Sequence, residues 1–406
     1  MRLQQRDIMS GSDPLNRREF VGLATGLAAS GLVSASGLAA EAAQNETGET
    51  AWASFRNGNQ LRGIATSPLP EKLELLWKVP VDDGVTATAA IVGDHVFAAT
   101  YGGELICLER KTGKRIWTYF SEEKKKPTSF IPGFQASPTV TGELVLIGDE
   151  YGVFHAVDRT TGKMRWKHET MAEIICSAAI VKDRIIFGSY DQTLYCLGFD
   201  GTEHWKRETG DRINGSPAIA GNITFVTGCD QHLRAVNIET GEEEFDLELG
   251  HFMIASPCVD KYMLYVGTHE SDFLAINLET QEVVWRFKDE AREFPIHSSA
   301  ALTDDLVIFG GQDKLVHCLE RKTGKEIWKF ATRGQVNSSP VVVGGNRVFV
   351  GSNDGYVYEV SLNDGKQRWK AKLGRSVSAS PAVGEGCLVI GAEGSEGEIH
   401  CFGAKR

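Results

Sequence analysis

The sequence predicts an all-β fold, an eight-bladed β-propeller of four-stranded antiparallel blades. Three observations lead to this prediction: a tryptophan that recurs with a period near 40 residues, a phrase of short apolar segments that accompanies it, and glycine-containing turns between the segments. A repeat of about 40–45 residues with four strands is typical of a propeller blade, which buries its faces by stacking in a ring.

The tryptophans are separated by 40, 49, 39, 80, 43 and 41 residues, and Phe245 lies at the midpoint of the gap of 80. Such regular spacing predicts a structural residue in the outermost strand of each repeat. The residues given this role are Trp77, Trp117, Trp166, Trp205, Trp285, Trp328 and Trp369.

The phrase is clearest in the repeat that begins at Ser137-Pro138. Apolar runs follow at 144–148 and 153–158, and Thr161-Gly162-Lys163 leads into the strand of Trp166. Runs of Val, Ile, Leu and Phe bounded by Gly, Asp and Asn predict short strands joined by tight turns. Eight such phrases begin at Thr88, Ser137, Ser177, Ser216, Ser256, Ser299, Ser339 and Ser380.

The eighth phrase has no tryptophan strand, because the chain ends after Cys401-Phe402. A tryptophan strand without a phrase lies at the other end of the repeats, at residues 73–78. We therefore expect the N-terminal strand to complete the last blade and to close a propeller domain of residues 71–406, which removes open sheet edges.

The N-terminal region does not share the repeat. Arg17-Arg18 precede a run rich in Gly and Ala that ends near Ala40-Glu41-Ala42, which predicts a twin-arginine-type signal peptide over residues 1–42. The mature protein is then periplasmic or secreted, and it has no membrane span. Because the first cysteine is Cys107, we expect no lipid attachment at the cleavage region.

Residues 43–70 are predicted to form an irregular leader. The aromatic side chains of Trp52 and Phe55 would hold this leader against the outside of the ring. The alternative is that they form a contact for another protein or for a carbohydrate.

The whole chain has a formal net charge of −11, and residues 41–406 carry −12. A strongly acidic surface argues against binding to nucleic acid. The basic run Lys124-Lys125-Lys126 in the longest inter-blade loop is interpreted as a solvated loop.

Four of the eight cysteines share one repeat position with Ala156, Ala235 and Ala275: Cys107, Cys196, Cys318 and Cys401. A free cysteine behaves as a small hydrophobic residue, so we expect these side chains to be buried packing groups. Two pairings stay open, Cys387 with Cys401 and Cys176 with Cys229. No Cys-x-x-Cys motif is present, which excludes the common zinc and haem signatures.

Binding is expected where loops between blades meet the mouth of the central channel, because loops on a rigid scaffold commonly carry function. The candidate residues are the polar ones just before each phrase: Gln135, Arg212, Asn214, His251, His297, Gln335, Asn337 and Arg375. A second set lies in tight turns and is interpreted as bonding its own backbone: Asp191, Asp230, His269, Asp313 and Asp354. No metal site is expected, and no hydrolase or phosphate-binding motif appears.

The segment Ala156-Val157-Asp158 to Trp166, with copies at 107–117 and 318–328, resembles the tryptophan-docking repeat of the pyrroloquinoline-quinone (PQQ) propellers. The resemblance covers residues 73–406 and implies the eight-bladed fold. It also implies one of two functions. Some propellers of this group are PQQ- and Ca²⁺-dependent alcohol or sugar dehydrogenases, and others are cofactor-free BamB propellers of outer-membrane barrel assembly.

The dehydrogenases stack the quinone against an adjacent-cysteine disulfide and hold Ca²⁺ with Glu and Asn beside a catalytic Asp. This chain has no Cys-Cys pair, and its blades are nearly uniform in length. We therefore expect an exported, non-catalytic scaffold, similar to BamB, that is a monomeric propeller, binds envelope proteins and needs no cofactor. The alternative is a PQQ/Ca²⁺-dependent oxidoreductase or a degenerate relative of one.

Overall fold

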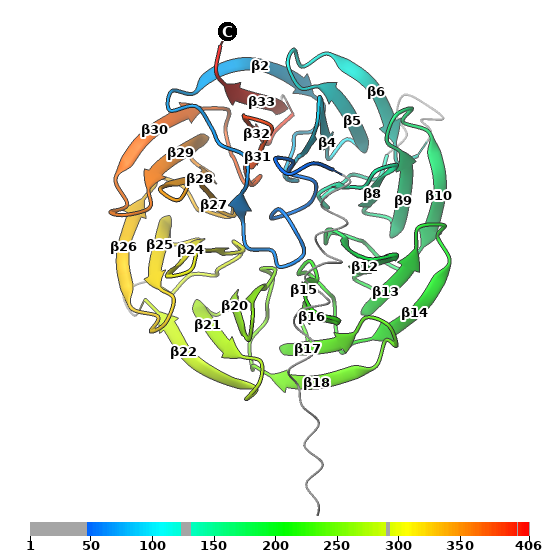
Figure 1. Ribbon diagram of the computed structural model, residues 1–406, viewed down its shortest axis with the longest axis vertical. Coiled ribbons are helices and arrows are strands. Elements are labelled where there is room, and N and C mark those ends of the chain that lie inside the picture. The colour runs from blue at the N-terminus through cyan, green and yellow to red at the C-terminus, as the bar shows by residue number, and fades with distance from the viewer. Residues whose placement is uncertain (1–46, 123–130, 290–292, 396, 406) are drawn as a thin grey trace, which may run out of the picture.

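The computed structural model describes residues 47–122, 131–289, 293–395 and 397–405. Their strands form eight sheets arranged in a closed ring (Figure 1). This confirms the predicted all-β, eight-bladed propeller of four-stranded antiparallel blades. The predicted signal peptide at 1–42 and the basic run at 124–126 lie outside the described residues. Within them, no helix is long and apolar enough to cross a membrane.

Each blade is an antiparallel sheet whose first strand faces the channel and whose fourth forms the outer rim. Blade 1 consists of β3 (Ala90–Val92), β4 (His95–Ala99), β5 (Glu104–Glu109) and β6 (Arg115–Phe120). Blade 2 consists of β7 (Thr139–Val140), β8 (Leu144–Gly148), β9 (Val153–Asp158) and β10 (Met164–Glu169). Blade 3 consists of β11 (Ala179–Val181), β12 (Arg184–Gly188), β13 (Thr193–Gly198) and β14 (Glu203–Glu208). Blade 4 consists of β15 (Ala218–Ala220), β16 (Ile223–Thr227), β17 (His232–Asn237) and β18 (Glu243–Glu248).

The second half of the ring repeats this plan. Blade 5 consists of β19 (Cys258–Asp260), β20 (Met263–Gly267), β21 (Asp272–Asn277) and β22 (Glu282–Lys288). Blade 6 consists of β23 (Ala301–Leu302), β24 (Leu306–Gly310), β25 (Leu315–Glu320) and β26 (Glu326–Ala331). Blade 7 consists of β27 (Val341–Val343), β28 (Arg347–Ser352), β29 (Tyr356–Ser361) and β30 (Gln367–Lys372), with the short β1 (Ile64–Ala65) added in parallel to β27.

Blade 8 joins the two ends of the propeller. Its strands are β31 (Ala382–Gly384), β32 (Cys387–Gly391), β33 (Gly397–Gly403) and, as the outer strand, β2 (Glu74–Val81). The antiparallel pairing of β2 with β33 places Trp77 opposite Cys401. The outer edge of the last three C-terminal strands is therefore covered by a strand from the start of the domain.

The repeated tryptophans dock each blade onto the next one. Six of them donate an indole N–H to a backbone carbonyl in a turn of the following blade, at 2.7–3.1 Å. The ring of Trp117 lies against Gly162 of that turn, where a Cβ would come within 2.6 Å of Trp117 Cδ2 and where φ is +69°. Glycine is required there both for its conformation and for the close approach of the ring. Trp369 faces no such turn, because blade 8 contains the two ends of the propeller where the other blades have this turn. The ring of Trp369 contacts Phe402 instead.

The small residue of the repeat lies opposite the tryptophan. Cys107 pairs with Trp117, Ala156 with Trp166, and Cys318 with Trp328, each beside a bulge in the outer pair of strands. These cysteines are buried, and burial raises the pKa of Cys107, Cys196 and Cys318 to about 12. The expectation of buried packing thiols is confirmed.

All eight cysteines are free, so the structure contains neither of the disulfides left open above. Val389 lies opposite Cys401 in the register of β32 and β33, which makes Cys387 its diagonal neighbour. The two side chains are in contact as free thiols, and the hydrogen bond from Cys401 lowers the pKa of Cys387 to about 6.

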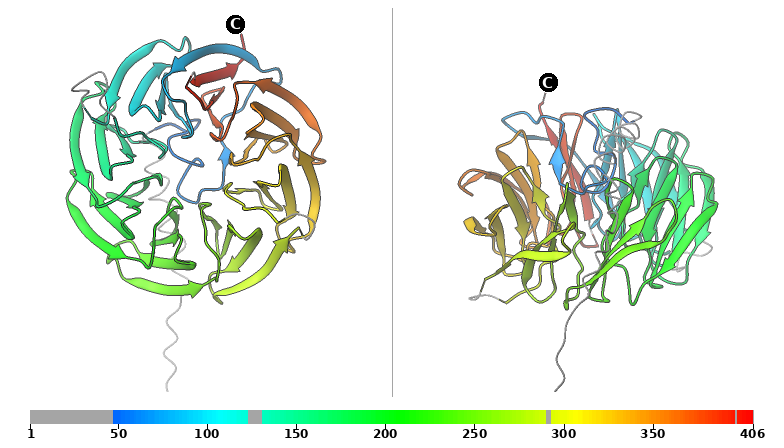
Figure 2. Two further views of the ribbon diagram at one scale, coloured as in Figure 1. Left: turned by 180° about the vertical axis from the view of Figure 1, so that it is seen from behind. Right: turned by 60° about the horizontal axis from the view of Figure 1, so that its bottom comes forward.

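The leader lies inside the ring, which corrects the prediction that it is held against the outside. Trp52 is fully buried and forms reciprocal backbone hydrogen bonds with Ile91 of β3, the inner strand of blade 1. Figure 1 shows the segment crossing the centre of the ring, and the reverse view in Figure 2 shows it behind the blades. Trp52 is buried here because the leader pairs with the free edge that the inner strand of blade 1 presents to the channel, whereas Phe55 is partly buried.

Candidate functional site: a blind funnel on the channel axis

The two faces of the ring differ in what closes them. The connection face carries the connections between successive blades and the turns between second and third strands. The leader face carries the remaining turns and the leader itself, and Figure 1 views the ring from this side. In the described part of the chain, the leader spans the channel at one face and Phe55 of the leader lines the channel cavity, so this cavity is approached from the connection face.

A cavity of about 170 Å³ lies on the axis below the connection face, and we call it the funnel. Phe55 of the leader lines it together with two residues from every blade except blade 1, which adds Ala87. One residue of each pair is the Ser or Thr that begins the repeat phrase, and the other lies two positions earlier. The earlier residues are Thr86, Gln135, Ile175, Asn214, Ile254, His297, Asn337 and Ser378.

Hydroxyls at the phrase position join the blades around the funnel. We call Thr88 with Ser137, Ser177, Ser216, Ser256, Ser299, Ser339 and Ser380 the Ser ring. In seven of the junctions, the backbone N–H of one member donates to the Oγ of the next blade's serine, at 2.8–3.0 Å. These N–H groups are buried, so each serine satisfies a donor that would otherwise be costly to bury.

The structure places four of the eight predicted site residues in the funnel: Gln135, Asn214, His297 and Asn337. Each lies two residues before its serine, and side chains two apart in an extended segment share a face. The other four are Arg212, His251, Gln335 and Arg375, which lie four or five residues before the serine and do not line it.

The reason for this division is a second set of backbone bonds. The carbonyl four residues before each phrase start accepts an N–H from the turn between second and third strands of the same blade. Arg212 O accepts from Cys229 N at 2.9 Å, and Gln335 O accepts from Asn353 N at 2.9 Å. This position is therefore tied to the blade's own turn, off the axis. Such a bond occurs in all eight blades, which makes the connection face a rigid platform.

Sequence reasoning missed four funnel positions: Thr86, Ile175, Ile254 and Ser378. They occupy the same repeat position as Gln135 and could have been found by aligning the phrases rather than by choosing polar residues. Phe55 could not have been found in this way, because the leader has no counterpart in the repeat.

The polar funnel residues are held by neighbours. Gln135 Nε2 donates to Glu150 Oε1 at 2.8 Å, and Asn214 Oδ1 accepts from Tyr190 Oη at 2.6 Å. Burial raises the pKa of Tyr190 to about 12, so this phenol is a stable donor. Asn214 Nδ2 donates in turn to Cys229 Sγ at 2.9 Å.

His297 is the one imidazole that lines the funnel. Gln312 Nε2 lies 3.0 Å from its Nδ1, and its Nε2 lies 3.1 Å from Nδ1 of the stacked His269. Burial first, and then His269, lower the pKa of His297 to about 4, so the ring is neutral at pH 7. Both ring nitrogens are engaged, which leaves no free base for proton abstraction.

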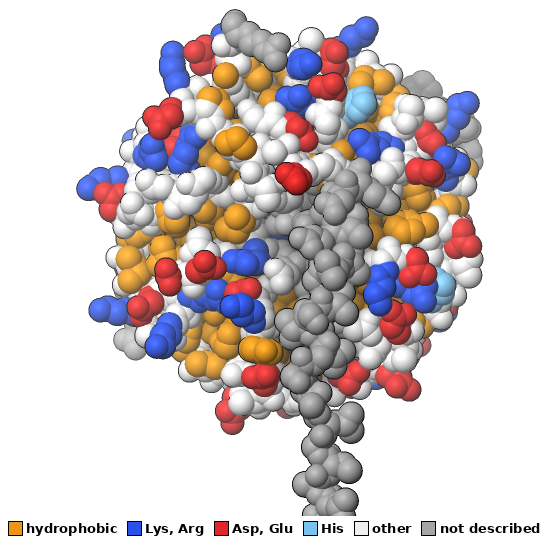
Figure 3. Space-filling view, viewed as in Figure 1, with side chains coloured by type: hydrophobic (Ala, Val, Ile, Leu, Met, Phe, Trp, Pro, Cys, Tyr) orange, Lys and Arg blue, Asp and Glu red, His pale blue; other side chains and the backbone are white. Residues whose placement is uncertain are grey.

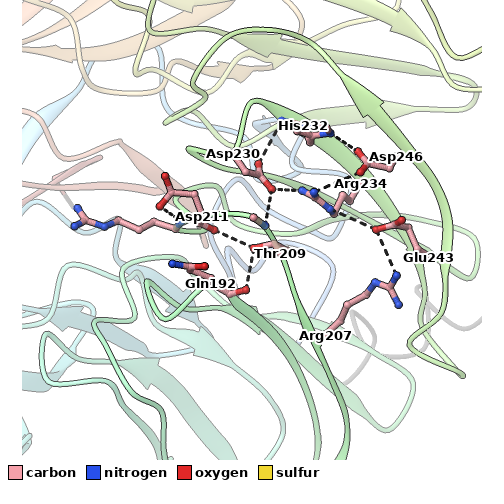
Figure 4. A network of polar contacts seen from close by, with 11 residues as sticks. Gln192, Arg207, Thr209, Asp211, Asp230, His232, Arg234, Glu243 and Asp246 are labelled. Carbon is pink, nitrogen blue, oxygen red and sulfur yellow. Dashed lines mark hydrogen bonds and ion pairs between the residues drawn. The ribbon is translucent and has the colours of Figure 1, made fainter.

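The turn residues behave as structural acceptors. Asp230 accepts N–H groups from Gly210 and His232 and pairs with Arg234 (Figure 4). Arg234 also faces Glu243 and Asp246, so this network ties the turn to the outer strand of its blade. Asp191 and Asp354 accept from Tyr195 and Tyr358 in the same way. His269 differs, because its ring contacts His297 rather than its own backbone.

A larger cavity of about 470 Å³ lies at the seam between blades 8 and 1. Two of its three carboxylates are paired, Glu104 with Arg115 at 3.3 Å and Glu398 with Lys78 at 2.7 Å, and the third, Asp82, is exposed to solvent. Among the described residues, no group of three or more His, Cys, Asp or Glu is arranged to hold a metal ion. The funnel, in contrast, is lined by uncharged groups that can form hydrogen bonds.

Two families of known proteins match the chain. The family described as the β-propeller of the β-alanine-activating enzyme matches residues 134–405. The chain belongs to this family. A second family, described as outer membrane protein assembly factor BamB, matches residues 39–189. Together with the tryptophan docking and the closed ring, these matches establish a PQQ-like repeat propeller.

Individual relatives divide between two kinds of protein. The BamB of Xanthomonas campestris pv. campestris is 24% identical over 302 residues, which cover 69% of this chain and 73% of that protein. The quinohemoprotein alcohol dehydrogenase ADH IIB of Pseudomonas putida is 35% identical over 108 residues, 25% of this chain. The matched region spans 15% of that dehydrogenase and 41% of the BamB of Burkholderia pseudomallei.

Solved structures divide in the same way. BamB from Moraxella catarrhalis superposes with a TM-score of 0.68 at 19% identity, over 82% of this chain and 100% of that one. The quinohemoprotein alcohol dehydrogenase of Comamonas testosteroni gives 0.74 at 14% identity, over 91% and 85%. At these identities the likeness shows the fold alone.

Proposed function

We propose that this chain is an exported, non-catalytic propeller scaffold that binds envelope proteins through its connection face. The observation that carries the proposal is the lining of the funnel. The described lining residues offer hydroxyls, amides, a neutral imidazole and apolar groups. Such a surface suits recognition by hydrogen bonding rather than acid–base or nucleophilic catalysis.

Exposed apolar side chains on the connection face support a protein partner. Met171 is 89% exposed and Phe294 48% exposed, and both lie in connections between blades. Apolar groups around a rigid polar depression are typical of protein contact sites. The relatives named as outer membrane protein assembly factors are consistent with a partner in the cell envelope.

The charge of the chain argues against a nucleic-acid partner. Acidic and basic side chains are interspersed over the leader face, without a broad patch of one sign (Figure 3). Together with a net charge of −11, this pattern disfavours nucleic acid as the ligand. Export to the periplasm or beyond rests on Arg17-Arg18 and the run that follows them, and it remains part of the proposal.

The alternative, a quinone- and Ca²⁺-dependent oxidoreductase, fits the funnel poorly. Calcium in proteins is held by several hard oxygen ligands that include carboxylates. The described lining contains no carboxylate, and Glu150, which contacts the lining residue Gln135, accepts hydrogen bonds from Gln135 Nε2 and Gly133 N. PQQ carries three carboxylates, and the lining offers no cationic side chain to pair with them. The residues present do not fit the quinone–calcium pair.

Photo-crosslinking in cells of the source organism tests the scaffold. A photoreactive amino acid would replace Met171 or Phe294 on the connection face, and Ile116 or Ile327 on the outer strands as matched exposed controls. We expect the two connection-face positions to link to the same envelope protein and the controls to give no such product. Equal products at all four positions would count against the connection face.

Calorimetry tests the alternative separately. The purified mature protein is titrated with PQQ, with and without Ca²⁺, alongside dye-linked oxidation of alcohols and sugars. We expect neither saturable binding nor turnover. Saturable Ca²⁺-dependent binding with turnover would replace the scaffold by an oxidoreductase.

A further inference from the structure

The leader makes one turn around the channel axis in the order of the blades. Its backbone carbonyls accept N–H groups at 2.8–3.0 Å, from the turn after the inner strand in blade 8 and from the inner strands in the other blades concerned. The donor–acceptor pairs in chain order are Glu385–Thr50, Ile91–Trp52, Val140–Ala53, Ile219–Asn59, Val259–Gln60, Leu302–Arg62 and Val342–Gly63. Blade 3 is joined differently, by Asn59 Nδ2 donating to Ile180 O. Every blade therefore holds the leader.

The bonds use one position of the repeat. Six of the seven N–H groups belong to the residue three places after the phrase start, in the inner strand of its blade. An inner strand has a sheet partner on one side only, so its free edge presents unpaired backbone groups to the channel. The leader pairs with these edges as an added strand does in β-augmentation, where the main chain supplies affinity.

Side chains fix the leader in this path. Trp52 and Arg56 are both fully buried, and Arg56 Nη2 donates to Ala300 O in blade 6 at 2.7 Å. Arg62 lies 3.5 Å from Asp260 in blade 5 and 3.6 Å from Asp304 in blade 6. These side-chain contacts add to the backbone hydrogen bonds that blades 5 and 6 already make with the leader.

The backbone of the leader is held in a costly conformation. Arg56, Asn57 and Leu61 have φ of 61°, 56° and 56°, in the left-handed region that non-glycine residues seldom occupy. Such residues persist only where the surroundings determine the conformation. The ring therefore imposes the path on the leader.

We propose that the inner edges of the eight blades form a peptide-binding site for extended main chain, occupied here by residues 50–65 of the same chain. The bound segment is a strap that seals the leader face and joins the blades in ring order. It starts at blade 8, where Thr50 O accepts from Glu385 N, and the chain returns to blade 8 directly after the strap, where Ser67 Oγ accepts from Gly386 N. The ring is thus closed twice at one seam, outside by β2 and inside by the strap.

A cleavable strap tests whether the site is separable from its ligand. A protease site is inserted between the exposed Glu71 and Lys72, and the full-length mature protein is cut after folding. A protein carrying the same site between Gly344 and Gly345, in an exposed turn of blade 7, is the control. A labelled synthetic peptide of residues 47–70 is then added, and its binding is measured by native mass spectrometry.

We expect the labelled peptide to replace the cut leader one for one, and only in the protein cut at residue 71. Equal binding to the uncut or control protein would overturn the proposal, because the peptide would then bind elsewhere. A cut leader that neither exchanges nor leaves before the ring unfolds would also overturn it, because the site would not be separable.

Two glycines provide a second test in the uncut chain. Gly63 and Gly93 have similar φ, 64° and 60°, but a Cβ on Gly63 would lie 1.9 Å from Arg56 Nη2, whereas one on Gly93 meets nothing within 4 Å. Gly63→Ala should accelerate hydrogen exchange of the six strap-bonded inner-strand amides by roughly tenfold. Gly93→Ala carries the same backbone strain and should leave them protected. Equal protection in the two variants would show that the strap does not cover these edges.

Discussion

The two ends of the channel use the same repeat in opposite ways. At the leader face, the position three residues after the phrase start is apolar in every blade: Ile91, Val140, Ile180, Ile219, Val259, Leu302, Val342 and Val383. At the funnel, the position two residues before it varies, from Thr86 and Gln135 to Ile175 and His297. The leader binds mainly through main chain, so the side chains there stay uniform. The funnel presents side chains rather than backbone edges, and this departure from the repeat is expected where the proposed partner would bind.

The largest expected effect comes from the leader end. Trp52→Ala removes a fully buried indole between blades 8 and 1 and should lower the free energy of unfolding by about 3–5 kcal/mol. Phe252→Ala, at a side chain 40% exposed on the connection face, should change it by less than about 0.5 kcal/mol. Denaturant unfolding of the mature protein measures both. A similar loss of unfolding free energy in the two variants would mean that the leader face and the connection face contribute equally to stability.

The next largest expected loss of stability distinguishes the Ser ring from the funnel residues two positions before it. Ser216→Ala removes the acceptor of the buried Ser177 N–H and should cost about 1–3 kcal/mol of unfolding free energy. Ser378→Ala lines the same funnel without such a bond and should cost about 0.5 kcal/mol or less. Urea unfolding curves compare them directly. A Ser378→Ala variant as unstable as Ser216→Ala would contradict the assignment of the ring as an inter-blade joint.

His297 makes the funnel end sensitive to pH. Its pKa is lowered to about 4 in the folded protein, below the usual value of 6.5. Between these values the unfolded chain binds more protons, so stability should fall as the pH decreases from about 6.5 to 4, with no contribution above that window. NMR titration of the imidazole should give a midpoint near 4, and His297→Gln should flatten the stability profile. A midpoint near 6.5 would show that the ring is not buried as described.

The smallest expected difference lies between two arginines at opposite ends. Arg62→Ala breaks partly exposed ion pairs to Asp260 and Asp304 and should cost about 0.2–1 kcal/mol. Arg375→Ala, at an exposed residue of the connection face, should stay within about 0.5 kcal/mol of the parent. Thermal unfolding at low and high salt resolves the pair, because only the Arg62 effect should shrink with salt.

The sequence by itself determined the ring. Trp117 contacts Gly162 of the next repeat, and equivalent pairs form the same contact between other neighbouring blades. Because the contact recurs with the period of the repeat, it is visible in the sequence as a regular spacing. The number of blades, the outer tryptophan strands and the small residue opposite each tryptophan follow from that periodicity. The sequence also showed the polar residues before each phrase. It did not show which of them face the channel axis.

Only the tertiary structure decided the path of the leader and the composition of the funnel. Residues 50–65 occur once, and their partners lie from about 40 to more than 300 positions away, so no recurring spacing reveals them. Their destination depends on the free strand edges that a closed ring presents, which no single repeat possesses. Similarly, Asn214 faces the funnel while Arg212 does not, because a backbone bond from Cys229 turns the chain between them. The local sequence pattern determines the contacts that recur from blade to blade. Closure of the ring determines the path of the leader and which side chains line the funnel.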